Sequence, residues 1–168
     1  QHVEKLVKIG VDSLKIEGRT KSAYYVARTA QTYRRAIDDA LAGRPFNPEL
    51  FAELEGLANR GYTDGFLERH QSHETQNYVS GYSSAKSSQY VGDVLRVDAD
   101  GWATVDVKNK FRVGDNIEII HPSGNQIVKL PAMMKDGVPI QEAAGGGHIV
   151  QIPNMQGKDK ALLTVVLS

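Results

Sequence analysis

The sequence has 168 residues, which is enough for one sizeable domain or two small ones. Its 20 basic and 20 acidic residues give a formal net charge of zero, which argues against a surface that attracts nucleic acid everywhere but allows a local basic patch. Because cysteine is absent, these residues can form no disulfide, thiolate zinc site, iron–sulfur site or cysteine nucleophile. A cytoplasmic protein is expected, and no run of about 18 apolar residues predicts a membrane-spanning helix.

The first residues already follow a helical pattern. Val3, Leu6 and Val7 recur at helical spacing, and Gly10 is typical of the position just after a helix. The chain starts with Gln1, and no capping residue precedes the pattern. We therefore expect the sequence to be part of a longer protein.

A short strand and a long helix are predicted next. Residues 11–16 form a bounded apolar run, which favours a strand. Residues 22–41 carry the strongest helical pattern, with Thr20 or Ser22 as the cap and Gly43 as the stop. The predicted apolar stripe of this helix consists of Val26, Ala30, Tyr33, Ile37 and Leu41. Since one strand cannot form a sheet, it must pair with strands outside this sequence or with a partner.

A second helix and a linker follow. Asn47 suits the N-cap and Pro48 the first helical position, and Gly61 is the predicted end of the helix. The next residues are polar, with few aliphatic side chains and a turn signal at 63–65. We interpret residues 45–84 as a helical arm and linker.

From Gln89 onward the periodicity changes from helical to alternating. Residues 102–107 alternate polar and apolar side chains, and the Asp100-Gly101 pair before them is a strong hairpin signal. Further strands are predicted at 90–97, 116–120, 126–130, 148–152 and 161–167. Six or seven short strands with close turns predict a small closed β-barrel, because closure removes exposed sheet edges.

The first candidate site lies where the predicted strand at 11–16 ends. In α/β folds, ligands bind at the carboxyl ends of strands. Glu17 could act as an acid, a base or a hydrogen-bond acceptor, Arg19 could clamp a carboxylate or phosphate, and Lys15 adds positive charge. The equally weighted alternative is a structural Glu17–Arg19 pair that fastens the strand to the helix.

The second candidate site is a basic stripe in the C-terminal part. Lys108, Lys110 and Arg112 alternate with other residues, so on one strand they would share a face. A row of cations beside Phe111 suits a nucleic-acid backbone. The alternative is an ordinary solvated strand.

Two further motifs carry little functional signal. His70 and His73 have a spacing that could ligate a metal on a helix, but they lie in a polar stretch without a second fixed pair, so no metal site is predicted. The glycine run 145–147 lacks the lysine and the following helix of a phosphate loop, and we interpret it as a bulge or wide turn.

Several stretches resemble peptidase family U-thirty-two, the collagenase-like proteins. The resemblance is carried by residues 12–19 (DSLKIEGR), 20–22 (TKS), 25–28 (YVAR), 33–38 (YRRAID), 59–66 (NRGYTDGF), 107–111 (VKNKF) and 114–115 (GD). It covers essentially the whole chain.

The resemblance implies an N-terminal, TIM-like catalytic domain and a C-terminal barrel similar to domain two of elongation factors. It further implies a role in prephenate-dependent hydroxylation of the wobble uridine of certain tRNAs. The resemblance also implies an iron–sulfur centre held by a cysteine cluster. This sequence contains no cysteine, so we expect no cofactor in it and place the cluster in the part of the longer protein outside this sequence. Lys15, Glu17 and Arg19 match a late-strand motif of the family, which implies that they line the site of the longer protein.

The fold predicted from these patterns is α+β in three parts. Residues 1–44 are the last strand and helix of the catalytic α/β barrel, residues 45–84 the helical arm and linker, and residues 85–168 a C-terminal β-barrel. The expected role is to position a tRNA or to dock on the catalytic N-terminal domain, without catalysis by these residues alone. A collagenase-like peptidase and a purely structural or protein-interaction barrel are the alternatives.

Overall fold

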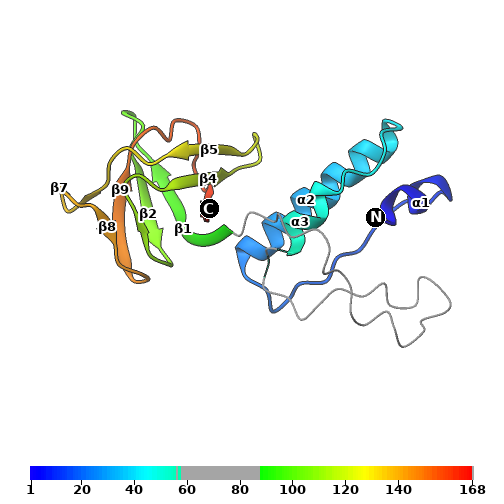
Figure 1. Ribbon diagram of the computed structural model, residues 1–168, viewed down its shortest axis with the longest axis horizontal. Coiled ribbons are helices and arrows are strands. Elements are labelled where there is room, and N and C mark those ends of the chain that lie inside the picture. The colour runs from blue at the N-terminus through cyan, green and yellow to red at the C-terminus, as the bar shows by residue number, and fades with distance from the viewer. Residues whose placement is uncertain (56, 58–87, 168) are drawn as a thin grey trace. The chain divides into compact units, whose positions relative to one another are not determined.

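The computed structural model describes residues 1–55, 57 and 88–167. The chain divides into two compact units, Gln1–Ala85 and Lys86–Ser168, and each is described by itself. The described part of the first unit is helical, and the second unit is built of β-strands (Figure 1). The boundary between the units lies close to the predicted boundary at residue 85.

Three helices make up the described part of the N-terminal unit: α1 (Val3–Lys8), α2 (Ala23–Leu41) and α3 (Glu49–Glu55). The predicted cap of α2 is confirmed, because the backbone N–H of Tyr25 donates to Ser22 Oγ at 3.2 Å. Gly10 has a φ of 83°, as expected for a residue that follows a helix. Val3, Ala36 and Leu50, one from each helix, form the core among the described residues of this unit.

The strand predicted at residues 11–16 is absent, and these residues run as irregular backbone. A strand is stable only when a neighbour takes up its backbone hydrogen bonds, and the described residues of this unit supply no such neighbour. Val11 and Ile16 are accordingly exposed. The remnant of a TIM-like barrel is therefore not confirmed as a structure.

The apolar stripe predicted on α2 is buried only in part, because Tyr33 and Ile37 pack against the core of this unit. Val26 is 48% exposed and Leu41 is 68% exposed, although both belong to the stripe. The helix fully buries a more polar set of side chains, which consists of Tyr24, Arg28, Thr29, Thr32 and Ala36. The hydrophobic pattern located the helix correctly and predicted only part of the face that packs within this unit.

The C-terminal unit contains an eight-stranded sheet in the order β5-β4-β10-β1-β2-β9-β6-β7. All of its printed pairings are antiparallel. The two remaining short strands, β3 and β8, pair with each other. The bounds are β1 (Ser88–Val97), β2 (Ala103–Val107), β3 (Phe111–Arg112), β4 (Asn116–Ile120), β5 (Gln126–Lys129), β6 (Met134–Lys135), β7 (Val138–Pro139), β8 (Glu142–Ala143), β9 (His148–Ile152) and β10 (Leu162–Val166).

The inward face of this sheet forms one continuous core. The predicted alternation in β2 is confirmed, because Ala103, Val105 and Val107 are buried while the residues between them are partly exposed. Phe111 and Met133 extend the same core beyond the central strands. The hairpin before β2 is also confirmed, since Gly101 has a φ of 82° and its N–H donates to the carbonyl of Asp98.

The closed barrel is not confirmed. The sheet ends at β5 on one side and β7 on the other, and no pairing among the described residues joins these two edges. The strands that the sequence did not predict, β3, β6, β7 and β8, have only two residues each, which is too short to show an alternating pattern. Among the described residues, no helix is both long and apolar enough to cross a bilayer.

Candidate functional site

The N-terminal candidates form a small exposed cluster after the irregular segment. Arg19 Nε donates to Glu17 Oε2 at 3.1 Å, and Lys15 Nζ lies 3.5 Å from Glu17 Oε1. The three side chains are 90%, 56% and 83% exposed for Arg19, Glu17 and Lys15. The structure therefore brings the predicted residues together. Glu17 pairs with Arg19, but this pair does not fasten a strand to α2.

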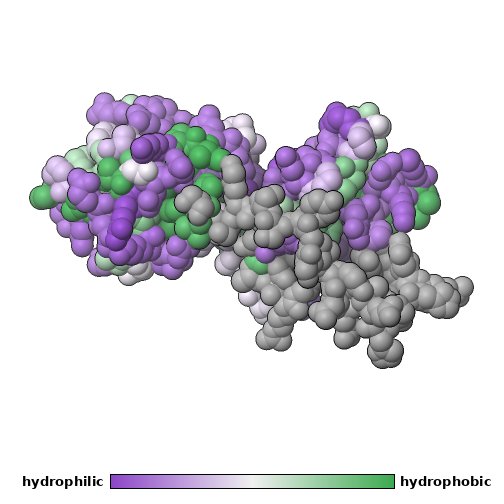
Figure 2. Space-filling model, in the orientation of Figure 1, coloured by the Kyte–Doolittle hydropathy of each residue, from purple (hydrophilic) through white to green (hydrophobic). Residues whose placement is uncertain are grey.

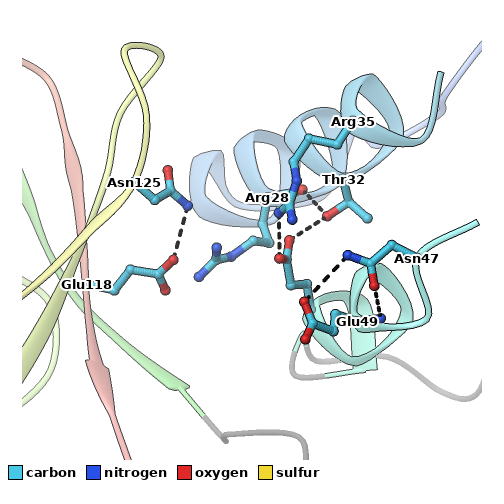
Figure 3. A network of polar contacts seen from close by, with 8 residues as sticks. Arg28, Thr32, Arg35, Asn47, Glu49, Glu118 and Asn125 are labelled. Carbon is cyan, nitrogen blue, oxygen red and sulfur yellow. Dashed lines mark hydrogen bonds and ion pairs between the residues drawn. The ribbon is translucent and has the colours of Figure 1, made fainter. Parts of the chain in front are cut away.

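The polar contacts between α2 and α3 are less exposed than the cluster of Lys15, Glu17 and Arg19. Glu53 receives hydrogen bonds from Arg35 Nη1 at 2.6 Å and from Thr32 Oγ1 at 3.3 Å (Figure 3). Asn47 caps α3 as predicted, because its Oδ1 accepts from the N–H of Glu49 at 3.0 Å. These contacts hold the two helices together and leave no carboxylate of the group without a partner.

A cavity of about 430 Å³ opens beside these helices. Its walls are mainly apolar and include Leu6, Tyr33, Phe46 and Leu54. Thr29 also lines it, and its Oγ1 is buried without a hydrogen-bond partner among the described residues. Since a buried hydroxyl ordinarily has a partner, Thr29 is an exception among the described side chains.

In the C-terminal unit, Lys108 lies between two carboxylates. Its Nζ donates to Asp106 Oδ2 at 2.7 Å and lies 3.7 Å from Asp93 Oδ2. The hydrogen bond to Asp106 raises the pKa of Lys108, which keeps the side chain charged. Tyr90 donates its hydroxyl proton to Asp93, and its burial together with this hydrogen bond raises the pKa of Tyr90. The four side chains form a connected network on β1, β2 and the segment after β2.

Lys110 and Arg112 share one carboxylate. Glu142, on β8, lies 3.0 Å from Lys110 Nζ and also accepts a hydrogen bond from Arg112 Nε. The hydrogen bond from Lys110 lowers the pKa of Glu142 most, and the hydrogen bond from Arg112 lowers it further. Two of the three predicted cations are thus brought together by a strand that the sequence did not predict.

The spacing of the three cations predicts that they lie along one strand, but they do not. β2 ends at Val107, Lys108 and Lys110 lie in the bend that follows, and Arg112 belongs to β3. Each of the three is at least 40% exposed and contacts a carboxylate. The site is therefore a belt of alternating charges. We name Lys108, Lys110 and Arg112 the cation belt.

A second polar cluster was not predicted at all. His121 Nδ1 lies 2.7 Å from Ser123 Oγ in the turn between β4 and β5, and Lys158 Nζ donates to the same Oγ at 3.1 Å. Lys158 is 35 residues further along the chain, so sequence spacing carries no signal for this contact. Beside the turn, Asn125 Nδ2 donates to Glu118 Oε1 at 3.0 Å (Figure 3).

The surface of the C-terminal unit is mixed. Figure 2 shows hydrophobic areas scattered among hydrophilic ones on its visible face. Leu95, Ile127, Val138 and Ile149 are the large exposed apolar side chains within its strands. In the part of the chain that the structure describes, no group of three or more potential ligands is placed to hold a metal ion. His70 and His73 lie outside that part.

Comparisons with known proteins agree with this division into two units. The model of peptidase family U32 matches residues 1–77, and the model of the peptidase family U32 C-terminal domain matches residues 86–163. The first match includes the predicted motif around Glu17, and the second includes the cation belt. Together they account for both units.

Individual relatives give more detail. The chain is 54% identical to tRNA hydroxylation protein P of Haemophilus influenzae over 152 residues, which cover 89% of this chain and 33% of that protein. It is 27% identical to a collagenase of Porphyromonas gingivalis, over 90% of this chain and 43% of the relative.

Among solved structures, the C-terminal domain of a U32 peptidase of Geobacillus thermoleovorans aligns at 26% identity and a TM-score of 0.41, covering 45% of this chain and 88% of that one. The chain spans about a third of the length of the first curated relative that it matches. Both halves of the sequence match the same family, so the chain belongs to peptidase family U32.

Proposed function

We propose that this chain positions RNA for a tRNA-hydroxylating protein, and that the cation belt of the C-terminal unit contacts the phosphate backbone. The observation that carries the proposal is the 54% identity to a protein named for tRNA hydroxylation, which extends over both units. A net charge of zero is compatible with this role, because only a local group of cations has to meet the RNA.

The carboxylates beside the cation belt do not prevent phosphate binding. All three ion pairs are partly exposed, and exposed pairs contribute only about 0–1 kcal/mol. A phosphate can therefore replace Glu142 or Asp106 at little cost. The carboxylates hold Lys108, Lys110 and Arg112 in place before RNA arrives and weaken non-specific binding.

Salt-dependent tRNA affinity of the chain tests this proposal. Replacing Lys108, Lys110 and Arg112 together by Gln should weaken binding at least about tenfold and lower the slope of log K against log salt by up to about 3. Glu142→Gln should strengthen binding roughly two- to fivefold, because it frees two cations at once.

Asp136→Asn is the matched control for Glu142→Gln. It removes one negative charge from an exposed turn, and Asn tolerates the φ of 51° that Asp136 adopts. Equal effects of the two substitutions would show that only net charge matters. Unchanged affinity after the triple replacement would remove the cation belt from the RNA contact.

We further propose that the N-terminal unit packs against the portion of the U32 domain that relatives possess and this chain does not match. The exposed stripe of α2, with Val26 and Leu41, and the cavity that Thr29 lines both suit such a contact. Lys15, Glu17 and Arg19 would then lie at the edge of the site of the longer protein. Their 56–90% exposure leaves them available to a ligand or to that domain.

The iron–sulfur centre that the family resemblance implies does not fit these residues. A cluster of that kind needs thiolate ligands, and the chain has no cysteine. We therefore derive no chemical step from the chain itself and assign to it the binding of substrate.

Peptidase activity is the second candidate, because the chain is similar to a protein named collagenase. Digestion of denatured collagen by a full-length protein that carries these two units, with and without a chelator, distinguishes the two functions. We expect no cleavage. Proteolysis that co-purifies with the protein through every step and is lost in an inactive variant would favour the peptidase.

A further inference from the structure

The turn between β4 and β5 holds a group of hydrogen-bond donors that the cation belt does not include. Ser123 Oγ contacts His121 Nδ1 at 2.7 Å and Lys158 Nζ at 3.1 Å. We name these three residues the His121 cluster. Ser123 is exposed, and His121 and Lys158 are half-buried, so the cluster is reachable from solvent and its longer side chains are partly held.

The hydrogen bonds determine which groups of the cluster can bind a ligand. The backbone N–H of Ser123 donates to His121 Nδ1 at 3.1 Å, so Nδ1 is an acceptor and the neutral ring carries its proton on Nε2. Lys158 uses one of its three N–H donors on Ser123 Oγ and retains two. The groups left over, His121 Nε2–H and the Lys158 ammonium, are donors only. Such a set fits an acceptor-only ligand, as a phosphate or carboxylate is.

Both segments that carry the cluster are fixed in place. The β4–β5 turn is closed by the Gly124 N–H, which donates to the carbonyl of His121 at 3.0 Å. The Lys158 N–H donates to the carbonyl of Met155, and the Ala161 N–H donates to the carbonyl of Lys158. Met155 and Ala161 are 1% and 0% exposed, so Lys158 is held between two buried anchors. Ordering these side chains around a ligand would therefore cost little conformational entropy.

Neighbouring carboxylates are engaged elsewhere. Glu118 accepts from Asn125 Nδ2 and from Thr164 Oγ1, and Asp159 accepts from the backbone N–H of Val97 at 2.9 Å. In the described parts of the chain, the polar contact of the Lys158 ammonium is with the hydroxyl of Ser123 and not with a carboxylate. Lys158 thus differs from the members of the cation belt, because each of them must release a carboxylate before it can contact a phosphate.

The contact between Ser123 and His121 does not suit nucleophilic catalysis. The lone pair of His121 Nδ1 already accepts the backbone N–H of Ser123, which weakens it as a base for the hydroxyl. Lys158 donates to Ser123 Oγ, which draws electron density away from the atom that would attack. These contacts favour binding of an anion over acyl transfer.

We propose that the His121 cluster binds a phosphate group of the RNA backbone, as a contact separate from the cation belt. This inference rests on the proposed function for the identity of its ligand. The preference for an anion that only accepts hydrogen bonds follows from the donors of His121 and Lys158.

Two measurements on the full 168-residue chain test the site. Titration with inorganic phosphate, against chloride at equal ionic strength, should shift the backbone amide resonances of residues 121–125, and Lys158→Gln or His121→Ala should abolish the shift. Lys158→Gln should also weaken tRNA binding about threefold and lower the salt slope by about 1. Lys158→Arg should retain most of the affinity.

Lys129→Gln is the matched control, because Lys129 pairs with Asn116 at the opposite end of the same hairpin and is also exposed. The site is overturned if phosphate leaves residues 121–125 unshifted, or if Lys158→Gln and Lys129→Gln change tRNA affinity equally. If the unsubstituted chain does not bind tRNA, the proposed function and the assignment to RNA both fail. In that case the phosphate titration alone decides whether the cluster is an anion site.

Discussion

At the scale of one residue, Gly92 is a position in β1 where the sheet leaves no room for a Cβ atom. The register of β1 against β10 shifts between Tyr90 and Gly92. A Cβ atom at this position would lie 2.8 Å from Val105 Cγ1 and 2.9 Å from the carbonyl oxygen of Asp106. The second of these atoms is backbone and cannot rotate away. Glycine is therefore required here by close packing, since its φ is not among the positive values of the chain.

Gly92→Ala should lower the free energy of unfolding of the C-terminal unit by about 1–3 kcal/mol, as overpacking of a rigid site does. Urea unfolding followed by the fluorescence of Trp102, the single tryptophan of the chain, measures this unit. Gly146→Ala is the control, because its Cβ would meet its closest neighbour, the carbonyl oxygen of Lys108, at a less severe 3.3 Å. A loss no larger than that of the control would contradict the role given to Gly92.

Helix α2 shows at the scale of an element that an amphipathic pattern can include apolar residues that its own unit leaves exposed. Its start at Ser22 and its length agree with the sequence. Its most apolar stripe, however, leaves Val26 and Leu41 exposed, while Arg28 and Thr32 are buried. Apolar surface of this kind is favourable only when something covers it. We propose that the part of the U32 domain that the chain does not match covers Val26 and Leu41.

A binding measurement tests this explanation. The part of the Haemophilus influenzae relative that the chain does not match should bind this chain when supplied as a separate polypeptide. Replacing Val26 and Leu41 by Gln should weaken that binding about tenfold or more, because each buried aliphatic side chain contributes roughly 1.5–3 kcal/mol. Arg34→Gln, a change at an exposed residue outside the predicted stripe, should have little effect. Equal binding by all three proteins would exclude the stripe as the contact.

At the scale of the whole molecule, the two units have separate cores. The C-terminal core runs from Val91 to Val165 and includes no residue of the helical unit. Among the described residues, the N-terminal core is much smaller, with Val3, Ala36 and Leu50 as its buried members. This asymmetry predicts that the C-terminal unit is the more stable and that it folds without the first.

Residues 86–168 expressed alone should unfold cooperatively in urea, with the same Trp102 fluorescence midpoint as the full chain, because every buried contact of that core is retained. The full chain measured under the same conditions is the reference. A broad transition or a clearly lower midpoint would show that the helical unit contributes to the stability of the sheet.

Local patterns were sufficient for much of the fold. The helical spacing and caps predicted α1, α2 and α3, and the alternation in residues 102–107 predicted which side of β2 is buried. These features depend on neighbours a few residues apart, so the sequence contains them directly. The same holds for the hairpin at Asp100-Gly101, since its conformation depends on residues within the turn.

Three outcomes depended on residues far apart in the chain. Residues 11–16 do not form a strand, because no described neighbour takes up their hydrogen bonds. The sheet stays open because closure requires β5 and β7 to meet, which no local pattern specifies. The short strands β3 and β8 exist only through their mutual pairing.

The candidate sites also depend partly on local sequence and partly on contacts between residues far apart in the chain. The sequence by itself determined the kinds of side chain available: the three cations of the belt, the Glu17 motif, the family, and the absence of thiolates. Only the tertiary structure decided what those side chains contact. It placed Glu142 between Lys110 and Arg112, and it brought Lys158 to Ser123 across 35 residues. The physical reason is that charge and propensity belong to single residues and short segments, whereas an ion pair or a shared hydroxyl exists only once the packing of a sheet has brought distant backbone segments within about 3 Å of each other.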